Sequence, residues 1–139
     1  MAKSNIKVTF LCPAEKVWRT VTDLLHYGWR SDLEKIEMID GRSFVEVTKD
    51  GIRTTFTVIE KRELELWEFD LENENMKGHW TGKFLKHGEK TTLDFTEDVT
   101  AKKLFLKPVI GIYLRKQQRQ YFADLKKELG CREAGGNKL

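Results

Sequence analysis

The chain contains little cysteine, and its pattern excludes the usual cysteine-based sites. Its 139 residues include two cysteines, Cys12 and Cys131, which lie near opposite ends of the sequence. They form no CxxC pair and belong to no larger framework, so the sequence indicates neither a disulfide scaffold nor a zinc site. On this ground we expect a reducing compartment, the cytoplasm.

Several other features of membrane proteins and enzymes are missing. No run of about 18 apolar residues occurs, so we expect no membrane span, and the N-terminus lacks the apolar stretch of a signal peptide. There is no Gly-x-Ser-x-Gly motif and no phosphate-binding glycine loop. The three histidines (His26, His79 and His87) form no i, i+4 pair and share no predicted strand face with a carboxylate. We therefore expect no catalytic residue of these kinds, no metal and no cofactor.

The composition is that of a soluble globular domain, with 40% hydrophobic and 34% charged residues. This length predicts one domain, which we place at residues 1–130 with a flexible tail at 131–139. Charge is uneven, because residues 1–101 carry 15 Lys/Arg against 19 Asp/Glu, whereas residues 102–129 carry 8 against 2. No aromatic residues alternate with these cations as nucleic-acid binding requires, so we expect a solvated basic helix face and no nucleic-acid partner. Oligomeric state stays open between monomer and homodimer.

Alternating polarity predicts seven strands. Pro13 at a first helical position and Thr22-Asp23 as a cap predict two short helices after the first strand. Asp-Gly pairs at 40–41 and 50–51 predict hairpin turns, and short connections throughout predict antiparallel pairing. The expected strands are Ile6–Leu11, Lys35–Ile39, Ser43–Lys49, Ile52–Glu60, Leu64–Leu71, Met76–Leu85 and Thr91–Val99.

One long amphipathic helix, roughly Pro108 to Leu129, follows the strands. Its expected sheet-facing side, read at a period of 3.6 residues, combines apolar and polar side chains. Buried polar groups need partners or water, so this side predicts a cavity between helix and sheet. The residues of this side are Ile110, Tyr113, Leu114, Gln117, Tyr121, Leu125 and Leu129.

The order of elements and several local motifs resemble the START-like, or SRPBCC (Bet v 1-like), superfamily, and a polyketide cyclase-like member in particular. Pro13-Ala-Glu-Lys-Val-Trp18 is similar to its Pro-Ala-x-x-Val-Trp entry to the first helix, and Thr91–Val99 to its last strand. Leu24 with Trp29 resembles its Asp-Leu…Tyr-x-x-Trp loop, and Asp50-Gly51 lies at its second hairpin. The resemblance implies an α+β helix-grip fold: a seven-stranded antiparallel sheet wrapped around the C-terminal helix, with a hydrophobic pocket between them.

Strand parity assigns candidate residues to that pocket. Glu97 shares a face with Leu93, Phe95 and Val99, where its carboxylate must be paired or have a raised pKa. Trp29 lies at the expected mouth, where Arg30 and Asp32 form either an exposed ion pair or a gate. Parity leaves the side of Glu46 undecided. Gly78 and Gly82 either open space for a ligand or mark bulges. The expected walls are Phe56, Phe69, Trp80, Phe95 and Tyr121, and the expected polar anchors are Glu97, Tyr113 and Gln117.

Three functions fit this arrangement. The first is binding of a hydrophobic lipid-like or aromatic molecule in the pocket, without catalysis. The second is an enzyme of the polyketide cyclase or aromatase kind, in which Glu97 or Tyr113 exchanges protons. The third is a protein-interaction module resembling the chaperone co-activators. The fold alone does not decide among them.

Overall fold

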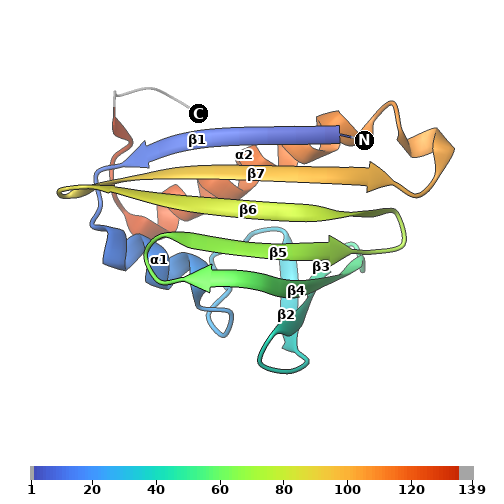
Figure 1. The fold of residues 1–139 in the computed structure, drawn as a ribbon, viewed down its shortest axis with the longest axis horizontal. Helices are drawn as coiled ribbons and strands as arrows, with labels where there is room; N and C mark the ends of the chain where they lie inside the picture. Colours follow the sequence, from blue (N-terminus) through green and yellow to red (C-terminus); the bar gives the residue numbers. More distant parts are fainter. Residues whose placement is uncertain (1, 135–139) are drawn as a thin grey trace.

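The computed structural model describes residues 2–134 and contains one antiparallel sheet, two α-helices and a short 3₁₀ helix, η1 (Figure 1). The sheet order is β1-β7-β6-β5-β4-β3-β2, so five consecutive hairpins form the sheet and β1 closes it beside β7. This confirms the helix-grip fold. The elements are β1 (Ala2–Phe10), α1 (Ala14–Thr22), β2 (Leu33–Met38), β3 (Ser43–Thr48), β4 (Arg53–Arg62), β5 (Leu66–Glu72), β6 (Met76–His87), β7 (Lys90–Ala101), η1 (Leu104–Leu106) and α2 (Ile110–Leu129).

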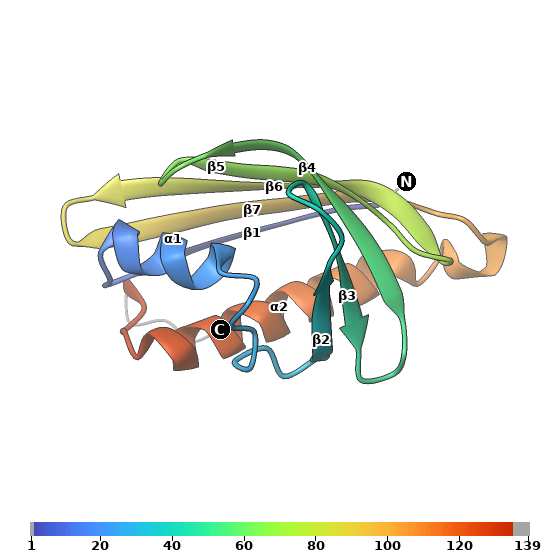
Figure 2. The same cartoon turned by 90° about the horizontal axis from the view of Figure 1, so that it is seen from below.

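The sheet curves around α2. Figure 2 shows β2 and β3 bending down beside the helix, while the longer strands cover it from above. A register shift between Val58 and Glu60 in β4 adds local twist of the kind that bends a sheet. Gly51, in the turn between β3 and β4, has a φ of 87°, which glycine adopts without the strain of a β-carbon. The concave face thus surrounds the helix on two sides.

Helix α1 packs against the β6–β7 end of the sheet. Val17 and Trp18 are buried as expected, and the Trp18 ring lies edge-on to Phe84 at 4.8 Å between centroids. The prediction of a second short helix between β1 and β2 is wrong, because α1 is followed by turns up to β2. The Asp23 carboxylate accepts a hydrogen bond from the Leu25 backbone N–H at 3.1 Å, which caps a turn rather than a further helix.

Helix α2 begins at Ile110 and ends at Leu129, and Gly130 follows it as the left-handed cap expected of glycine, with a φ of 67°. None of the helices in residues 2–134 has the length and apolar character that crossing a bilayer requires. The side that faces the sheet differs from the predicted one by a rotation. The buried residues of α2 are Ile110, Leu114, Gln118, Phe122, Leu125 and Leu129.

The rotation arises because Gln118, and not Gln117, finds a polar partner in the sheet. Ser4 on β1 donates to the Gln118 side chain at 2.6 Å, and the Gln118 amide donates back to the Ser4 carbonyl at 3.1 Å. These two hydrogen bonds satisfy the buried Gln118 amide at the interface between helix and sheet. Tyr113, Gln117 and Tyr121 consequently lie along the flank of α2.

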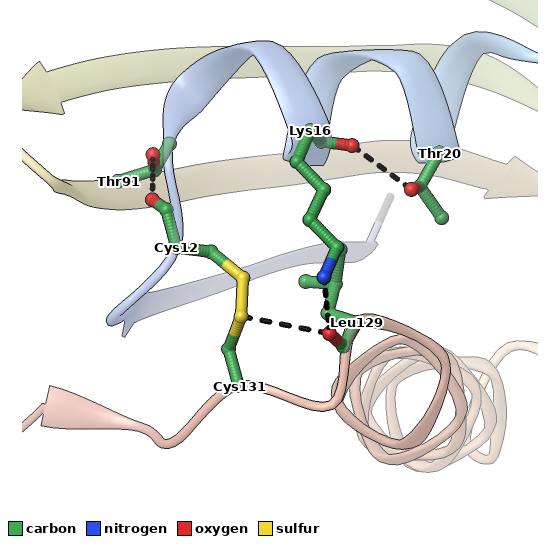
Figure 3. The surroundings of a disulfide bond; sticks show 6 residues. All are labelled: Cys12, Lys16, Thr20, Thr91, Leu129 and Cys131. Carbon is green, nitrogen blue, oxygen red and sulfur yellow. Dashed lines mark hydrogen bonds between the residues drawn. A yellow bond between two sulfur atoms is a disulfide. The ribbon is translucent and has the colours of Figure 1, made fainter.

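Cys12 and Cys131 form a disulfide, which the sequence did not indicate (Figure 3). Their Cα atoms lie 5.9 Å apart although 119 residues separate them in sequence. Beside the bond, the Leu11 N–H donates to the Arg132 carbonyl at 2.7 Å and Lys16 Nζ donates to the Leu129 carbonyl at 2.8 Å. Three links therefore fasten the end of α2 to the start of α1.

These links also correct the predicted tail. Residues 131–134 are attached to β1, where Phe10 and Glu133 form an isolated bridge, and residues 135–139 lie outside the described part of the chain. Stable disulfides are typical of oxidising compartments. Cytoplasmic localisation therefore stays a prediction, and the disulfide weakens its original basis.

Candidate functional site

A cavity of about 110 Å³ lies between α2 and the concave face of the sheet. One side is aromatic and the other carries charged and hydrogen-bonding groups. The loop between α1 and β2 borders it with Leu24, Arg30 and Asp32. The lining residues are Val21, Leu24, Arg30, Asp32, Phe44, Glu46, Phe56, Trp67, Phe69, Trp80, Phe95, Glu97, Gln117, Gln118, Tyr121 and Phe122.

The aromatic side is one continuous set of ring contacts across β3 to β7. Phe44 stacks on Phe56 at 5.0 Å, and Phe69 stacks on Trp80 at 4.6 Å with an angle of 5° between the planes. Trp80 then meets Phe95 edge-on at 4.6 Å. Alternation places one such ring on each strand's inner face, and cross-strand pairing brings them into contact. The result is a rigid apolar wall that fits a flat or aliphatic molecule.

On the polar side, Arg30 is held by two carboxylates. Its guanidinium donates two hydrogen bonds to Asp32, both 3.2 Å, and two to Glu46, at 3.3 and 3.4 Å. It also lies over the Tyr121 ring, 4.8 Å from the centroid. Burial alone would lower the pKa of Arg30, but Glu46 and Asp32 outweigh it and raise that pKa. Arg30 stays charged, and the three groups together carry one net negative charge.

Glu97 projects from β7 into the same cavity, as parity predicted. Burial raises the pKa of Glu97, the nearby Glu46 carboxylate adds to this rise and Arg30 opposes both, and together they bring the pKa to about 7. Among the described residues no hydrogen bond to this carboxyl contributes to that pKa. Glu97 therefore presents a carboxyl group that is half protonated near neutral pH and free to bond to whatever occupies the cavity.

Tyr121 provides a second polar group on the same side. Burial raises the pKa of its hydroxyl, Arg30 lowers it, and Glu46 and Asp32 raise it again. The hydroxyl therefore stays protonated and available as a donor at neutral pH. Glu97 and Tyr121 thus give the cavity two hydrogen-bonding groups opposite the aromatic wall.

The loop that covers the cavity, residues 23–32, is fastened to α2. The Ser31 backbone N–H and hydroxyl both donate to Asp124, each at 2.8 Å, and Gln120 donates to the Ser31 hydroxyl at 3.0 Å. Trp29 packs edge-on against Tyr121 at 5.4 Å. The contacts at Ser31 are exposed to solvent, whereas Arg30, in the same loop, is held by Glu46 on β3 and packs over Tyr121. The loop is therefore fastened to both α2 and β3.

Seven of the nine predicted ligand-binding residues line the cavity: Phe56, Phe69, Trp80, Phe95, Glu97, Gln117 and Tyr121. Trp29 does not line it and instead supports Tyr121 from outside. Tyr113 is 39% exposed. It lies one turn before Gln117 on α2 and lines a different cavity. Burial raises the pKa of its hydroxyl, with smaller contributions from Glu97 and Asp32.

The main residues that the sequence did not assign to the cavity are Arg30, Asp32 and Glu46. The question of which side Glu46 faces is settled by its contact with Arg30, which places it inside. Arg30 and Asp32 lie in the loop before β2, whereas Glu46 lies on β3, so no single helical or strand periodicity connects the three residues. Only the curvature of β3 toward the 23–32 loop brings them together.

The glycines of β6 do not leave open space. A β-carbon at Gly82 would overlap the ring of Trp80, which lies across that position, and one at Gly78 would overlap the backbone of β7 at Asp98. The expectation that Gly82 makes room for a ligand is therefore wrong, because its missing side chain makes room for the protein's own tryptophan. Gly78 allows close approach of two strands where the sheet bends.

On the outer face, His79 lies between two carboxylates, so the expectation that no histidine shares a face with one is wrong. Its imidazole contacts Asp70 at 2.8 Å and Glu68 at 2.7 Å. Partial burial lowers the pKa of His79, but these two hydrogen bonds outweigh it and raise that pKa overall. Within residues 2–134, no cluster of three or more His, Cys, Asp or Glu side chains is arranged to hold a metal ion.

The comparison with protein families gives one match, which spans residues 1–130. It is the family described as "Polyketide cyclase / dehydrase and lipid transport". The chain belongs to this family. A search of curated proteins found no match.

Several solved structures share the fold of this chain at low sequence identity. A START superfamily protein from Mycobacterium smegmatis has a TM-score of 0.82 at 15% identity, covering 94% of this chain and 98% of that one. The aromatase/cyclase Zhui from a Streptomyces species has a TM-score of 0.81 at 13% identity, covering 92% and 93%. At these identities the likeness is one of fold, so the function has to be argued from the cavity itself.

Proposed function

We propose that this protein binds an uncharged, ring-containing hydrophobic molecule that carries a hydroxyl or carbonyl group, in the cavity between the sheet and α2. The observation that supports this most strongly is the position of Glu97, a partly buried carboxyl for which residues 2–134 provide no hydrogen-bond partner, opposite a wall of stacked aromatic rings. The rings contribute apolar contact, and Glu97 with Tyr121 fixes the orientation of the polar group.

The charge of the site selects against anionic ligands. Among residues 2–134, Arg30 is the only cation that lines the cavity, and Asp32 and Glu46 already accept its hydrogen bonds. A carboxylate ligand would therefore meet the net negative charge of this group and would force Glu97 to stay protonated. A phenol or ketone has no such cost, since Glu97 accepts from a hydroxyl when ionised and donates to a carbonyl when protonated.

The volume of the cavity limits what it holds with the loop closed. A protein cavity of about 150 Å³ accommodates benzene, whereas drug-sized ligands occupy about 300–1,000 Å³. At about 110 Å³, the cavity with the loop in its present position has room for a few water molecules or part of one ring. A larger ligand therefore requires the 23–32 loop to move away from Asp124.

Calorimetric titration with naphthol tests the proposal, with naphthoate as the anionic ligand of matched ring size. We expect naphthol to bind at one site and naphthoate to bind at least tenfold more weakly. Gln117→Phe, which fills the cavity from α2, should abolish naphthol binding, whereas Ala123→Phe on the exposed side of the same helix should leave it unchanged. Equal binding of both ligands, or binding that survives Gln117→Phe, contradicts the proposal.

A second function, proton-transfer catalysis on a ring-forming substrate, is favoured by the pKa of Glu97. A carboxyl with a pKa of about 7 is effective as both general acid and general base at neutral pH. One of the solved structures with this fold is described as an aromatase/cyclase. If the protein acts in this way, product formation from a poly-β-ketone substrate should stop in Glu97→Gln while naphthol binding persists.

A further inference from the structure

The corner where β7 leads into α2 exposes a group of large apolar side chains. Leu104 is 78% exposed and Phe105 is 73% exposed, and both belong to η1. Val109 and Ile112, at the start of α2, are also exposed. In Figures 1 and 2, η1 and the segment that joins it to α2 project beyond the end of β7. We call these four residues the apolar corner.

Positive charge surrounds the apolar corner. Residues 99–123 contain no Asp or Glu, and they include six Lys or Arg: Lys102, Lys103, Lys107, Arg115, Lys116 and Arg119. The first turn of α2 has no acidic residue and no side-chain cap, so the positive end of the helix dipole also lies at this corner. The acidic groups on neighbouring elements are Glu72, which pairs with Lys102 at 2.7 Å, Glu74 in the adjacent turn, and Asp50, whose charge acts on the Tyr113 hydroxyl.

A second apolar cavity, of about 230 Å³, lies directly behind the apolar corner. It shares Val109 with the corner, and Asn73 and Asn75 are its polar lining residues apart from the Tyr113 hydroxyl. The corner is thus the outer edge of a larger apolar region that ends at the surface, rather than four isolated side chains.

We propose that the apolar corner docks this protein onto the surface of an anionic membrane, with Leu104 and Phe105 inserted among the lipid chains and the surrounding lysines at the headgroups. Protruding apolar side chains ringed by Lys and Arg are the arrangement that binds such interfaces. The long lysine stems let the ammonium groups reach the headgroups while the apolar tips insert more deeply.

Charge complementarity favours this occupant over the alternatives. Two copies of the chain that met through the same corner would bring together two groups of cations, which repel one another. Nucleic acid would satisfy the cations but would leave Leu104 and Phe105 against a phosphate backbone, where apolar side chains gain nothing. An anionic bilayer satisfies both features at once.

Flotation of the full chain with vesicles tests the proposal, using phosphatidylcholine alone and a mixture with phosphatidylserine. We expect binding only to the mixture, and weaker binding as salt is raised. The double variant Leu104→Ser/Phe105→Ser should bind roughly 10- to 100-fold more weakly. The matched control Leu25→Ser/Ile39→Ser, which alters two exposed apolar residues elsewhere, should bind as the wild type does.

A charge variant tests the second half of the proposal. Lys103→Gln/Lys107→Gln should weaken binding roughly 25-fold at low salt, about fivefold per cation, whereas Lys7→Gln/Lys83→Gln on the outer face of the sheet should not. Three results would overturn the proposal: no binding of the wild type to the anionic vesicles, equal binding by Leu104→Ser/Phe105→Ser, or concentration-dependent dimerisation that this variant abolishes. All variants change exposed residues, and circular dichroism verifies that they are folded.

Discussion

Replacing Glu97 with glutamine should stabilise the protein at alkaline pH and leave its stability unchanged at acidic pH. In the folded chain, burial raises the pKa of Glu97 to about 7 from an ordinary value of 4.5. The folded state therefore binds a proton that the unfolded state has released between these two values. By linkage, the free energy of unfolding falls as pH rises through this interval.

The size of the effect follows from that interval. A difference of two and a half pKa units corresponds to about 3 kcal/mol, at about 1.4 kcal/mol per unit. Glutamine keeps the shape of the protonated acid and never ionises. The variant should therefore equal the wild type at pH values below about 4.5 and exceed it by about 3 kcal/mol well above pH 7.

Urea unfolding of both proteins across this pH range measures the difference directly. Glu89→Gln makes the same chemical change at an exposed turn, and it should show no such pH-dependent gain. If Glu97→Gln changes stability by the same amount at every pH, the carboxyl is not desolvated as the structure indicates. If it destabilises the protein throughout, Glu97 serves as a structural hydrogen-bond partner, and the ligand-binding role is lost.

Two further predictions concern the links that hold α2. The double variant Cys12→Ser/Cys131→Ser should unfold about 4 kcal/mol more easily in oxidising buffer, since the bond closes a long loop; the same unfolding midpoint as the wild type would show that the cysteines are reduced in the isolated protein. Asp124→Ala should release the 23–32 loop, speed hydrogen exchange of the Ser31 amide roughly tenfold and accelerate naphthol association. Glu128→Ala, on the same helix but exposed, should alter neither quantity, and unchanged exchange in Asp124→Ala would remove the loop from the entry route.

Local sequence pattern predicted the strands and one buried acid. Alternation over Leu93, Phe95 and Glu97 places all three on one face, and a strand has only two faces, so parity was sufficient. The same logic assigned Phe56 and Phe69 to the aromatic wall. The hairpin turns followed from Asp-Gly pairs, because these residues adopt turn conformations largely independently of the rest of the fold.

Features that depend on distant partners were not predictable in this way. On α2 the row through Gln117 and Tyr121 and the row through Gln118 and Phe122 are both amphipathic. The polar partner of the buried Gln118 is Ser4, 114 residues away in the sequence. The contact between Arg30 and Glu46 depends on the curvature of β3. The space at Gly82 is filled by Trp80 from the same strand, which alternation does not reveal.

The crystal structure of the protein soaked with naphthol is the most direct test of the central claim, that this cavity is the binding site. We expect the naphthol rings to lie against Trp80 and Phe95, with the hydroxyl within hydrogen-bond distance of Glu97 or Tyr121 and the 23–32 loop displaced from Asp124. Naphthol bound only on the surface, with the cavity and the loop unchanged, would contradict it.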